Sequence, residues 1–540
     1  MPRPLLVLII FGYFFLASLI PQLFIQGFST PEDPYYHARH AVSYWDKEPF
    51  EYPQFSTIND SGTDLWYLYH VSMAPFTAIP SDDGYSGIIL GSKIYHAVLS
   101  ALLFTILVLC LVNIQTPARS KVQKTTLWSV LLSLGIIMTA SATFADRALI
   151  LSRPHLISIT LFVLATYFLI KKRHISLAFV SLLAPLFYSF SLLIIIPALV
   201  YPVAYLFYVG IRNREAVLGL MRACILSGVS IIGCILGIIL HPGSGAYIFN
   251  GLFVHATSLF RTVVPQGRLV EYPAELGGAP FQWGEWWALI GALVLAVTVL
   301  RIISYKSIRR SFEFVTWFVI CLSLPFVFLS IFVGRGIEYA LPLLLFPLSI
   351  AISWCIPRHR SLLSYLSGNP AITFFEKHPR VIRGVGIAVA ICILPILIIG
   401  KGSALKENEQ TQGVFAYKNA ANFIASQGDG GIVLNPAFHL YPQLVFFNPR
   451  GKYGLGFDPT FTYIYDEEIY WLLQDIGYYK EVDPEAARKL LYSKGVRYVI
   501  EEKVEVNDTP RGTVAATLRL GEPIYTDPDT GEVMIWKIAP

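Results

Sequence analysis

A succession of long apolar runs constrains this chain more than any other feature. About eleven runs are long enough for a membrane helix of about 17 to 25 residues; they lie near 4–25, 86–112, 126–145, 154–170, 175–188, 189–210, 221–240, 286–304, 313–333, 338–356 and 382–400. Hydrophobic residues make up 54% of the 540 residues and charged residues 14%, whereas soluble domains carry about 25% charged residues. The sequence therefore predicts a polytopic α-helical membrane protein with about 11 transmembrane helices.

The basic residues lie in short runs between the apolar runs, although the net charge is +5. They form no single basic face of the kind that binds nucleic acid. If the amino terminus is inside, every basic run, such as 171–173, falls on the inner side, as the positive-inside rule requires. This holds only if 175–210 forms two helices, so we expect a hairpin with Ser189 and Ser191 at its tip.

The same topology predicts two domains. Residues 1–400 form a transmembrane domain with outer loops at 26–85 and 241–285, and residues 401–540 form a domain outside. The first apolar run is preceded by Arg3 and has no small-residue cleavage site, which is typical of a retained anchor. We therefore expect an integral protein of the cytoplasmic membrane, with its amino terminus inside and its carboxy-terminal domain outside.

The carboxy-terminal domain has mixed polar and apolar sequence typical of a small α/β extracytoplasmic fold. We expect helices near 413–426, 466–475 and 484–494, strands near 431–435 and 496–501, and a hairpin around 527–531. All six cysteines lie in or beside apolar runs, so we expect no disulfide framework and no Cys-ligated zinc. The aromatic residues between 441 and 465 either bind sugar or peptide, or belong to the core or the membrane interface.

The densest ionisable cluster is Glu32-Asp33-Pro34-Tyr35-Tyr36-His37-Ala38-Arg39, just after the first apolar run. A charge costs a few kcal/mol near the bilayer centre and much less at the membrane edge, so an ionisable cluster at the edge favours a functional interpretation. Asp33 and Pro34 also suit the capped start of a helix. A cap does not account for Glu32, His37 and Arg39 as neighbours, and we therefore predict an active site here.

This run resembles the Asp-Pro-aromatic-aromatic-His/Asn-x-Arg motif of oligosaccharyltransferase catalytic subunits, which are members of the GT-C glycosyltransferase superfamily. The resemblance extends to the plan of many helices, a long first outer loop and an outer carboxy-terminal domain. It implies transfer of a sugar or glycan from a polyprenyl-phosphate or pyrophosphate carrier to an acceptor on the outer membrane face. Asp33, with Glu32 beside it, would be catalytic, either holding a divalent metal or accepting the acceptor's proton.

The resemblance also implies a divalent metal, Mg or Mn, held by Asp33 and by acidic residues of the second outer turn at 146–153. That turn offers only Asp146, which is either the second ligand or the partner of Arg147 or Arg153 in a local salt bridge. Basic side chains are the candidates for binding the donor phosphate, because Arg has the bidentate geometry for it. They are His37, Arg39, Arg147, Arg153 and His155, with interfacial solvation as the alternative for His37 and Arg39.

Two further candidates lie later in the chain. Glu271 precedes a proline by two residues, like the family's outer-loop Glu that engages the acceptor or the metal, and its Gly- and Pro-rich loop suits a lid. Arg335, at an outer helix end, could reach a lipid-linked phosphate, with Glu338 either orienting it or forming an ion pair with it. Asp64 is expected to cap a helix rather than to bind a ligand.

The acceptor stays open between protein and lipid. The family's Trp-Trp-Asp-Tyr-Gly signature does not occur in the carboxy-terminal domain, which leaves a protein or lipid mono-glycosyltransferase of the mannosyltransferase or aminoarabinose-transferase type as the alternative. The alternative from another class is a lipid or solute transporter. A transporter should show inverted repeats and ionisable residues near the midplane, whereas the charges here collect at one face. The expected partners are a polyprenyl-linked sugar donor, the acceptor and membrane lipid, but no nucleic acid.

Overall fold

A computed structural model gives the fold of this chain. It describes residues 3–30, 33–47, 50–115, 124–209, 214–254, 310–332, 336–355, 400, 402–403, 405–406, 416–456, 459–477, 480–502 and 513–539. Three of the predicted site residues, Glu32, Glu271 and Arg335, lie outside the described residues. The expected helices near 286–304 and 382–400 lie outside them as well.

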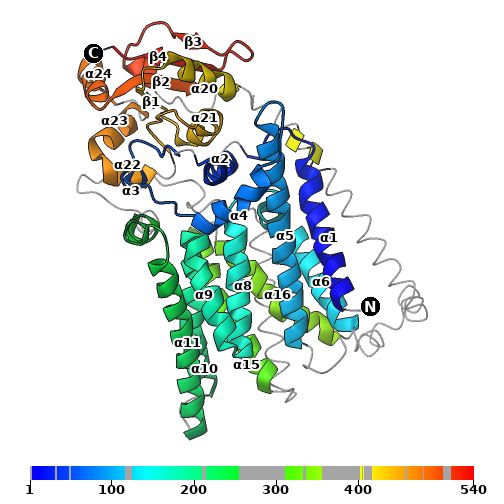
Figure 1. Ribbon diagram of the computed structural model, residues 1–540. Coiled ribbons are helices and arrows are strands. Elements are labelled where there is room, and N and C mark those ends of the chain that lie inside the picture. Colours follow the sequence, from blue (N-terminus) through cyan, green and yellow to red (C-terminus); the bar gives the residue numbers. More distant parts are fainter. Residues whose placement is uncertain are drawn as a thin grey trace, which may run out of the picture.

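Up to residue 355, the described chain is helical and forms an elongated bundle with the carboxy-terminal domain at one end (Figure 1). The helices are α1 (Arg3–Gln22), α2 (Asp33–Asp46), α3 (Thr57–Ser61), α4 (Tyr67–Thr77), α5 (Ser86–Gln115), α6 (Lys124–Ala140), α7 (Ala142–Leu149), α8 (His155–Lys171), α9 (His174–Phe187), η1 (Ser189–Ile194), α10 (Ile195–Val209), α11 (Arg214–Ile239), α12 (Ser244–Tyr247), η2 (Ile248–Val254), α15 (Arg310–Phe332) and α16 (Gly336–Cys355).

Four helices in the described part of the chain are long and apolar enough to cross a membrane. They are Pro4–Gln22 of α1, Ser86–Gln115 of α5, Ser191–Val209 at α10, and Arg214–Ile239 of α11. The apolar window of α5 is 72% buried and that of α1 only 28%, so α5 lies inside the bundle while α1 presents apolar side chains outward. Apolar side chains exposed in this way suit lipid better than water. The chain is therefore a helical membrane protein; the total of about eleven spans stays a prediction.

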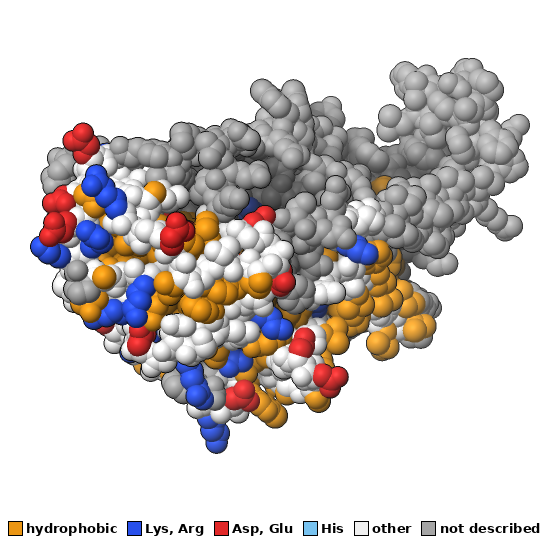
Figure 2. Space-filling view, turned by 90° about the horizontal axis from the view of Figure 1, so that it is seen from above, with side chains coloured by type: hydrophobic (Ala, Val, Ile, Leu, Met, Phe, Trp, Pro, Cys, Tyr) orange, Lys and Arg blue, Asp and Glu red, His pale blue; other side chains and the backbone are white. Residues whose placement is uncertain are grey.

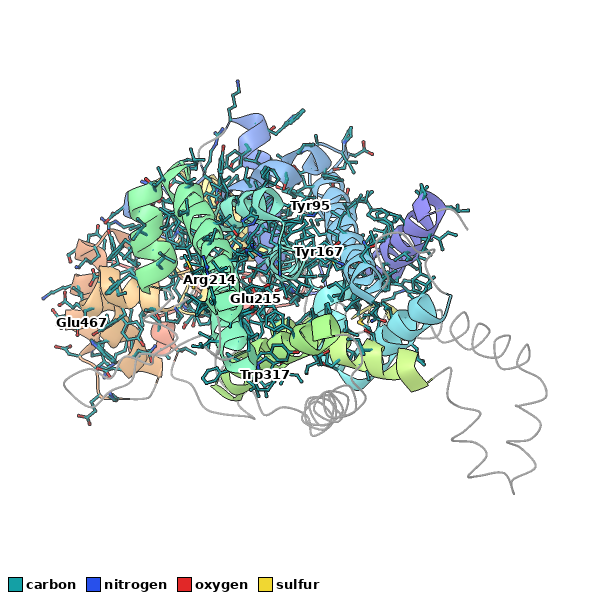
Figure 3. All side chains as sticks on the ribbon, turned by 90° about the horizontal axis from the view of Figure 1, so that it is seen from below. Tyr95, Tyr167, Arg214, Glu215, Trp317 and Glu467 are labelled. Carbon is teal, nitrogen blue, oxygen red and sulfur yellow. The ribbon has the colours of Figure 1, made fainter. Side chains whose placement is uncertain are left out.

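The chain breaks within 175–210, as the charge pattern predicted. Helix α9 ends at Phe187, Tyr188 is extended, and the 3-10 helix η1 leads into α10. Helix α11 packs against both α9 and α10. On another side of α10, the indole nitrogen of Trp317 in α15 donates to the carbonyl of Ala204 at 3.2 Å (Figure 3). Residues 175–210 therefore form two helical segments in one packed bundle.

The two ends of the bundle differ: one end contacts the carboxy-terminal domain, and the opposite end carries basic residues. At the basic end, Lys171 of α8 donates its Nζ to the carbonyl of Asn113 near the end of α5, at 2.8 Å. At the opposite end, Tyr85, just before α5, packs on Phe446 of the carboxy-terminal domain with ring centroids 5.8 Å apart. The basic run 171–173 thus lies far from the carboxy-terminal domain (Figure 1), which is the separation that the positive-inside topology requires.

The carboxy-terminal domain contains a four-stranded sheet of order β1-β2-β4-β3. Strand β1 pairs parallel with β2, whereas β2 with β4 and β3 with β4 pair antiparallel. The strands are β1 (Ile432–Leu434), β2 (Val496–Glu502), β3 (Tyr525–Thr526) and β4 (Val533–Lys537), and the helices are α20 (Ala416–Gln427), η5 (Phe438–Leu440), α21 (Tyr441–Phe447), α22 (Pro459–Tyr465), α23 (Glu467–Gly477), α24 (Pro484–Ser493) and α25 (Val514–Thr517). In the view from above, Lys, Arg, Asp and Glu side chains are spread over the left part of the surface, while hydrophobic side chains form a broad patch at the lower right (Figure 2).

The secondary structure expected in this domain is present. The predicted helices correspond to α20, α23 and α24, and the predicted strands to β1 and β2. The hairpin between β3 and β4 turns on Asp527, whose carboxylate accepts the backbone N–H of Thr530 at 2.8 Å, and on Gly531 with φ +68°. Asp and Gly are the residues that such a turn requires. The small helices α21 and α22 were not predicted.

The aromatic residues between 441 and 465 mainly join the carboxy-terminal domain to the first outer loop. Tyr441, Phe446 and Phe461 are buried. The hydroxyl of Tyr441 donates to the carbonyl of Glu51 at 2.8 Å, and Phe446 packs edge-on against Tyr35 of α2 with centroids 5.2 Å apart. These aromatics are therefore core, one of the two alternatives, and they seat α2 beneath the domain.

Candidate active site

Asp33 begins helix α2 at the end of the bundle that faces the carboxy-terminal domain (Figure 1). The following Pro34 has the φ angle of a first helical turn, and the helix dipole favours an acidic side chain there. The Asp33 side chain is 41% exposed, and its Oδ2 lies 3.1 Å from the Nε of Arg153, whose side chain is 7% exposed. The fold thus brings together two predicted site residues, an accessible carboxylate and a buried guanidinium.

Hydrogen bonds from the neighbouring helices fix the backbone on both sides of this pair. Lys93 of α5 is buried and donates its Nζ to the carbonyl of Ile25, in the connection between α1 and α2, at 2.8 Å. The hydroxyl of Ser29 in the same connection donates to the carbonyl of Ile150, next to the Arg153 segment, at 3.1 Å. Polar groups away from water need such partners. The candidate pair therefore sits on two segments that are tied to the same framework.

Glu338 contacts a predicted site residue on another helix. Its buried side chain forms an ion pair with Arg147 of α7; Arg335, which was expected beside it, lies outside the described residues. The Glu338 side chain is 3% exposed and that of Arg147 is 22% exposed. This contact joins α16 to α7 near the candidate site.

Asp146 lies in α7, not in a turn. The turn expected at 146–153 begins only after this helix ends at Leu149, because a backbone hydrogen bond from Ile150 to Asp146 still closes the last helical turn. The two arginines proposed as local partners of Asp146 each form an ion pair with another carboxylate, Arg147 with Glu338 and Arg153 with Asp33. The Asp146 side chain is half-buried.

The Mg or Mn ion that the resemblance implies at Asp33 and Asp146 stays a prediction. Among the described residues, no group of three His, Cys, Asp or Glu ligand atoms converges on Asp33. One oxygen of its carboxylate lies beside the guanidinium of Arg153.

His37 is buried in the protein. It is 3% exposed, and its Nδ1 lies 2.8 Å from the Nε2 of His70 in α4. Burial lowers the pKa of His37 well below its ordinary value, and the neighbouring His70 and Arg153 lower it further. Interfacial solvation, one of the two alternatives for His37, is therefore wrong.

Asp64 was expected to cap a helix, but the N-cap position of α4 is Trp66 and no side-chain cap hydrogen bond forms there. Asp64 instead anchors a buried cluster. Its Oδ1 accepts the backbone N–H of Trp66 at 2.9 Å, and its Oδ2 accepts the hydroxyl of Tyr44 at 2.9 Å. The same Oδ2 lies 2.7 Å from the Nδ1 of His70 and 3.7 Å from the Nε2 of His40. Burial raises the pKa of Asp64, but the two histidines outweigh it and hold the pKa below its ordinary value. Burial lowers the pKa of His40 to about 3.

Helix α4 is held in place by α5. The hydroxyl of Tyr95, which lies within the bundle in Figure 3, is 2.6 Å from the Oγ of Ser72 in α4. This contact fixes the helix that carries His70. Sequence reasoning did not select His40 or His70. The spacing of three between His37 and His40 places both on one face of α2, but nothing in the sequence predicts that His70 packs against that face.

Two further predicted site residues, Arg39 and His155, lie on α2 and α8. Arg39 is half-buried on α2. His155 is the first residue of α8 and is 5% exposed, two residues after Arg153.

No family model matches this sequence, and no curated protein matches it. Among solved structures, the chain is similar to the oligosaccharyltransferase of Archaeoglobus fulgidus tethered with an acceptor peptide containing the NVT sequon. That similarity has a TM-score of 0.52 at 11% identity and covers 93% of this chain and 69% of the other. It is also similar to AglB from Archaeoglobus fulgidus in complex with an inhibitory peptide and a dolichol-phosphate, with a TM-score of 0.55 at 11% identity, covering 92% and 69%. The chain therefore shares its fold with archaeal oligosaccharyltransferase, a member of the family that its run at 32–39 resembles.

Proposed function

We propose that this protein is a membrane glycosyltransferase that moves a sugar or glycan from a polyprenyl-phosphate or pyrophosphate carrier to a protein or lipid acceptor. The observation that carries the proposal is the pairing of an accessible Asp33 with a buried Arg153 at one end of the bundle. The shared fold supports it, since one of the similar structures is a complex with a dolichol-phosphate and another holds an acceptor peptide.

Glycosyl transfer of this kind makes one bond and breaks one. A nucleophilic oxygen or nitrogen of the acceptor attacks the anomeric carbon of the donor sugar. The bond from that carbon to the phosphate oxygen breaks, and the carrier phosphate leaves with the bonding electrons. The reaction therefore needs a base for the acceptor's proton and a cation for the phosphate.

The pair supplies both groups. We assign Asp33 as the base, because its carboxylate is accessible and stands at the start of α2. We assign Arg153 as the phosphate ligand, since a guanidinium binds phosphate oxygens bidentately. The donor phosphate competes with Asp33 for Arg153, so that donor binding frees the carboxylate to accept the acceptor's proton.

The other predicted residues take supporting roles in the proposal. Arg39 and Arg335 contact the donor phosphates, Glu32 assists Asp33, and Glu271 engages the acceptor. His155 contributes from the start of α8 by supporting the Arg153 segment.

The site faces the outside of the cytoplasmic membrane in this proposal. The separation of the basic run 171–173 from the carboxy-terminal domain supports that orientation, because basic residues are retained on the cytoplasmic side. The donor is then used on the outer face, where the carboxy-terminal domain covers α2.

The test is transfer of radiolabelled sugar by the purified full chain from a panel of polyprenyl-phosphate and pyrophosphate donors, offered to peptide and lipid acceptors. Asp33→Asn keeps the shape of the side chain and removes the base, and Asp82→Ala removes an exposed carboxylate of the same outer loop. We expect transfer by wild type and by Asp82→Ala, and its loss in Asp33→Asn. Undiminished transfer by Asp33→Asn would overturn the assignment. Parallel reactions with EDTA show whether a divalent ion takes part.

A further inference from the structure

The cluster of His40, Asp64 and His70 contacts His37 through His70 and takes no part in the proposed reaction. One donor atom from each residue lies within 4.8 Å of the others, and all three residues are buried. Asp64 Oδ2 is 2.7 Å from His70 Nδ1 and 3.7 Å from His40 Nε2. The three donors come from α2, from the segment before α4 and from α4 itself. We propose that these three side chains bind a divalent transition-metal ion, with zinc the best match, at a site separate from Asp33.

The charge of the cluster favours a bound cation. Asp64 is 8% exposed, and among the described residues no Lys or Arg forms an ion pair with it. Its ionic contacts are the two histidines. Burying a carboxylate without a compensating cation costs several kcal/mol. A divalent ion between the carboxylate and two neutral imidazoles removes that cost.

The outer polar atoms of the three ligands are held as they are in metal sites. His70 Nε2 is 2.8 Å from His37 Nδ1, and His40 Nδ1 is 3.0 Å from the hydroxyl of Tyr36. Asp64 Oδ1 accepts a backbone N–H, as described above. Metal-bound imidazoles almost always donate their second ring N–H to such a partner, which fixes the ring and its tautomer. With Nδ1 of His70 on the metal, its Nε2–H donates to His37.

The donor set selects the class of metal. Two imidazole nitrogens and one carboxylate oxygen suit zinc and other divalent first-row transition metals, whereas Mg and Ca prefer oxygen donors throughout. The hydroxyl of Tyr44 donates to the same Asp64 oxygen at 2.9 Å. A water molecule bound beside that hydroxyl would be the fourth ligand of a tetrahedral site. This ion is therefore chemically distinct from the Mg or Mn ion implied for Asp33.

The position of the cluster predicts a structural role for the ion. It ties α2, which carries Asp33, to α4 and to the loop before it. His37 extends the cluster along α2, since its Nδ1 lies 2.8 Å from the Nε2 of His70. An ion that binds only the folded chain stabilises it in proportion to its affinity. Loss of the ion should therefore lower the stability of the protein, and this can be measured without an assay of sugar transfer.

The experiment measures metal content by mass spectrometry in the full chain, purified in detergent without metal resin. Asp64→Asn and His70→Ala weaken the site, whereas Asp33→Ala and His439→Ala are matched controls, the latter removing a histidine that is 41% exposed. We expect equimolar zinc or another first-row metal in wild type and both controls, and a loss of at least about tenfold in the two site variants, as expected when a ligand is removed.

Two measurements on the wild type keep the proposal testable if a site variant does not fold. Stripping with a zinc chelator should lower the thermal midpoint, and returning zinc should restore it. Cobalt loaded into the stripped protein should give the visible absorption of a four-coordinate site. The contrary result is wild-type protein that contains no first-row metal and whose thermal midpoint changes with neither chelator nor zinc. It would show that protons shared among the imidazoles neutralise Asp64 instead. That result would overturn the metal site and leave the transfer reaction untouched.

Discussion

The ion pair between Arg147 and Glu338 makes an asymmetric prediction. The Glu338 side chain is 3% exposed and the Arg147 side chain 22% exposed. Arg147→Ala removes the cation from beside this buried carboxylate, which costs about 3–5 kcal/mol of unfolding free energy. Glu338→Gln leaves a guanidinium that still reaches water and can donate a hydrogen bond to the new amide oxygen, so we expect a loss of about 1–2 kcal/mol.

The assay is thermal unfolding of the detergent-purified protein, followed by tryptophan fluorescence, for both single variants and for Arg147→Ala combined with Glu338→Gln. The double variant should lose less stability than the sum of the two single losses, because no buried charge remains unpaired. Arg147 is also a candidate phosphate ligand, and an unchanged midpoint in Arg147→Ala would refute the structural reasoning. So would a larger loss in Glu338→Gln than in Arg147→Ala.

Two further predictions concern pH and packing. The pKa of His40 is lowered to about 3 and that of His37 is lowered too, so the unfolded chain binds protons that the folded chain does not. Stability should therefore fall as pH drops below about 6.5, by about 2 kcal/mol from His40 at pH 5 and by a further amount from His37; a midpoint that rises between pH 7 and 5 would contradict this. Gly91→Ala should lower the thermal midpoint, because the new Cβ would lie 1.8 Å from the backbone oxygen of Phe76, whereas Gly12→Ala meets nothing within 4 Å and should be neutral. Equal midpoints would refute the packing argument.

Local sequence predicted most of the secondary structure that is described. Apolar length identifies α5 and α11 as spans, and the charge pattern predicted the break at Tyr188. The strands β1 and β2 follow from short β-rich runs. The sequence predicts a turn from residue 146, but residues 146–149 still belong to α7, where a buried partner on α16 accommodates the charge of Arg147.

Contacts between distant segments could not be predicted in this way. The run at 32–39 identified Asp33, but the choice of Arg153 over Arg147 as its partner depends on how α7 and α8 pack. His70 lies on an aromatic helix whose sequence is typical of the membrane interface, and only the packing of α4 on α2 brings it to His37 and His40. Such partners are set by tertiary packing, which one sequence does not specify.

The most direct test of the central claim is the rate of sugar transfer by Asp33→Asn relative to wild type, measured with the donor that wild type uses best. We expect the rate to fall by at least about 100-fold, the lower range for removing a general base, in protein that is folded at the assay temperature. A variant that folds like wild type and transfers sugar at the wild-type rate would contradict the assignment of Asp33 as the catalytic base.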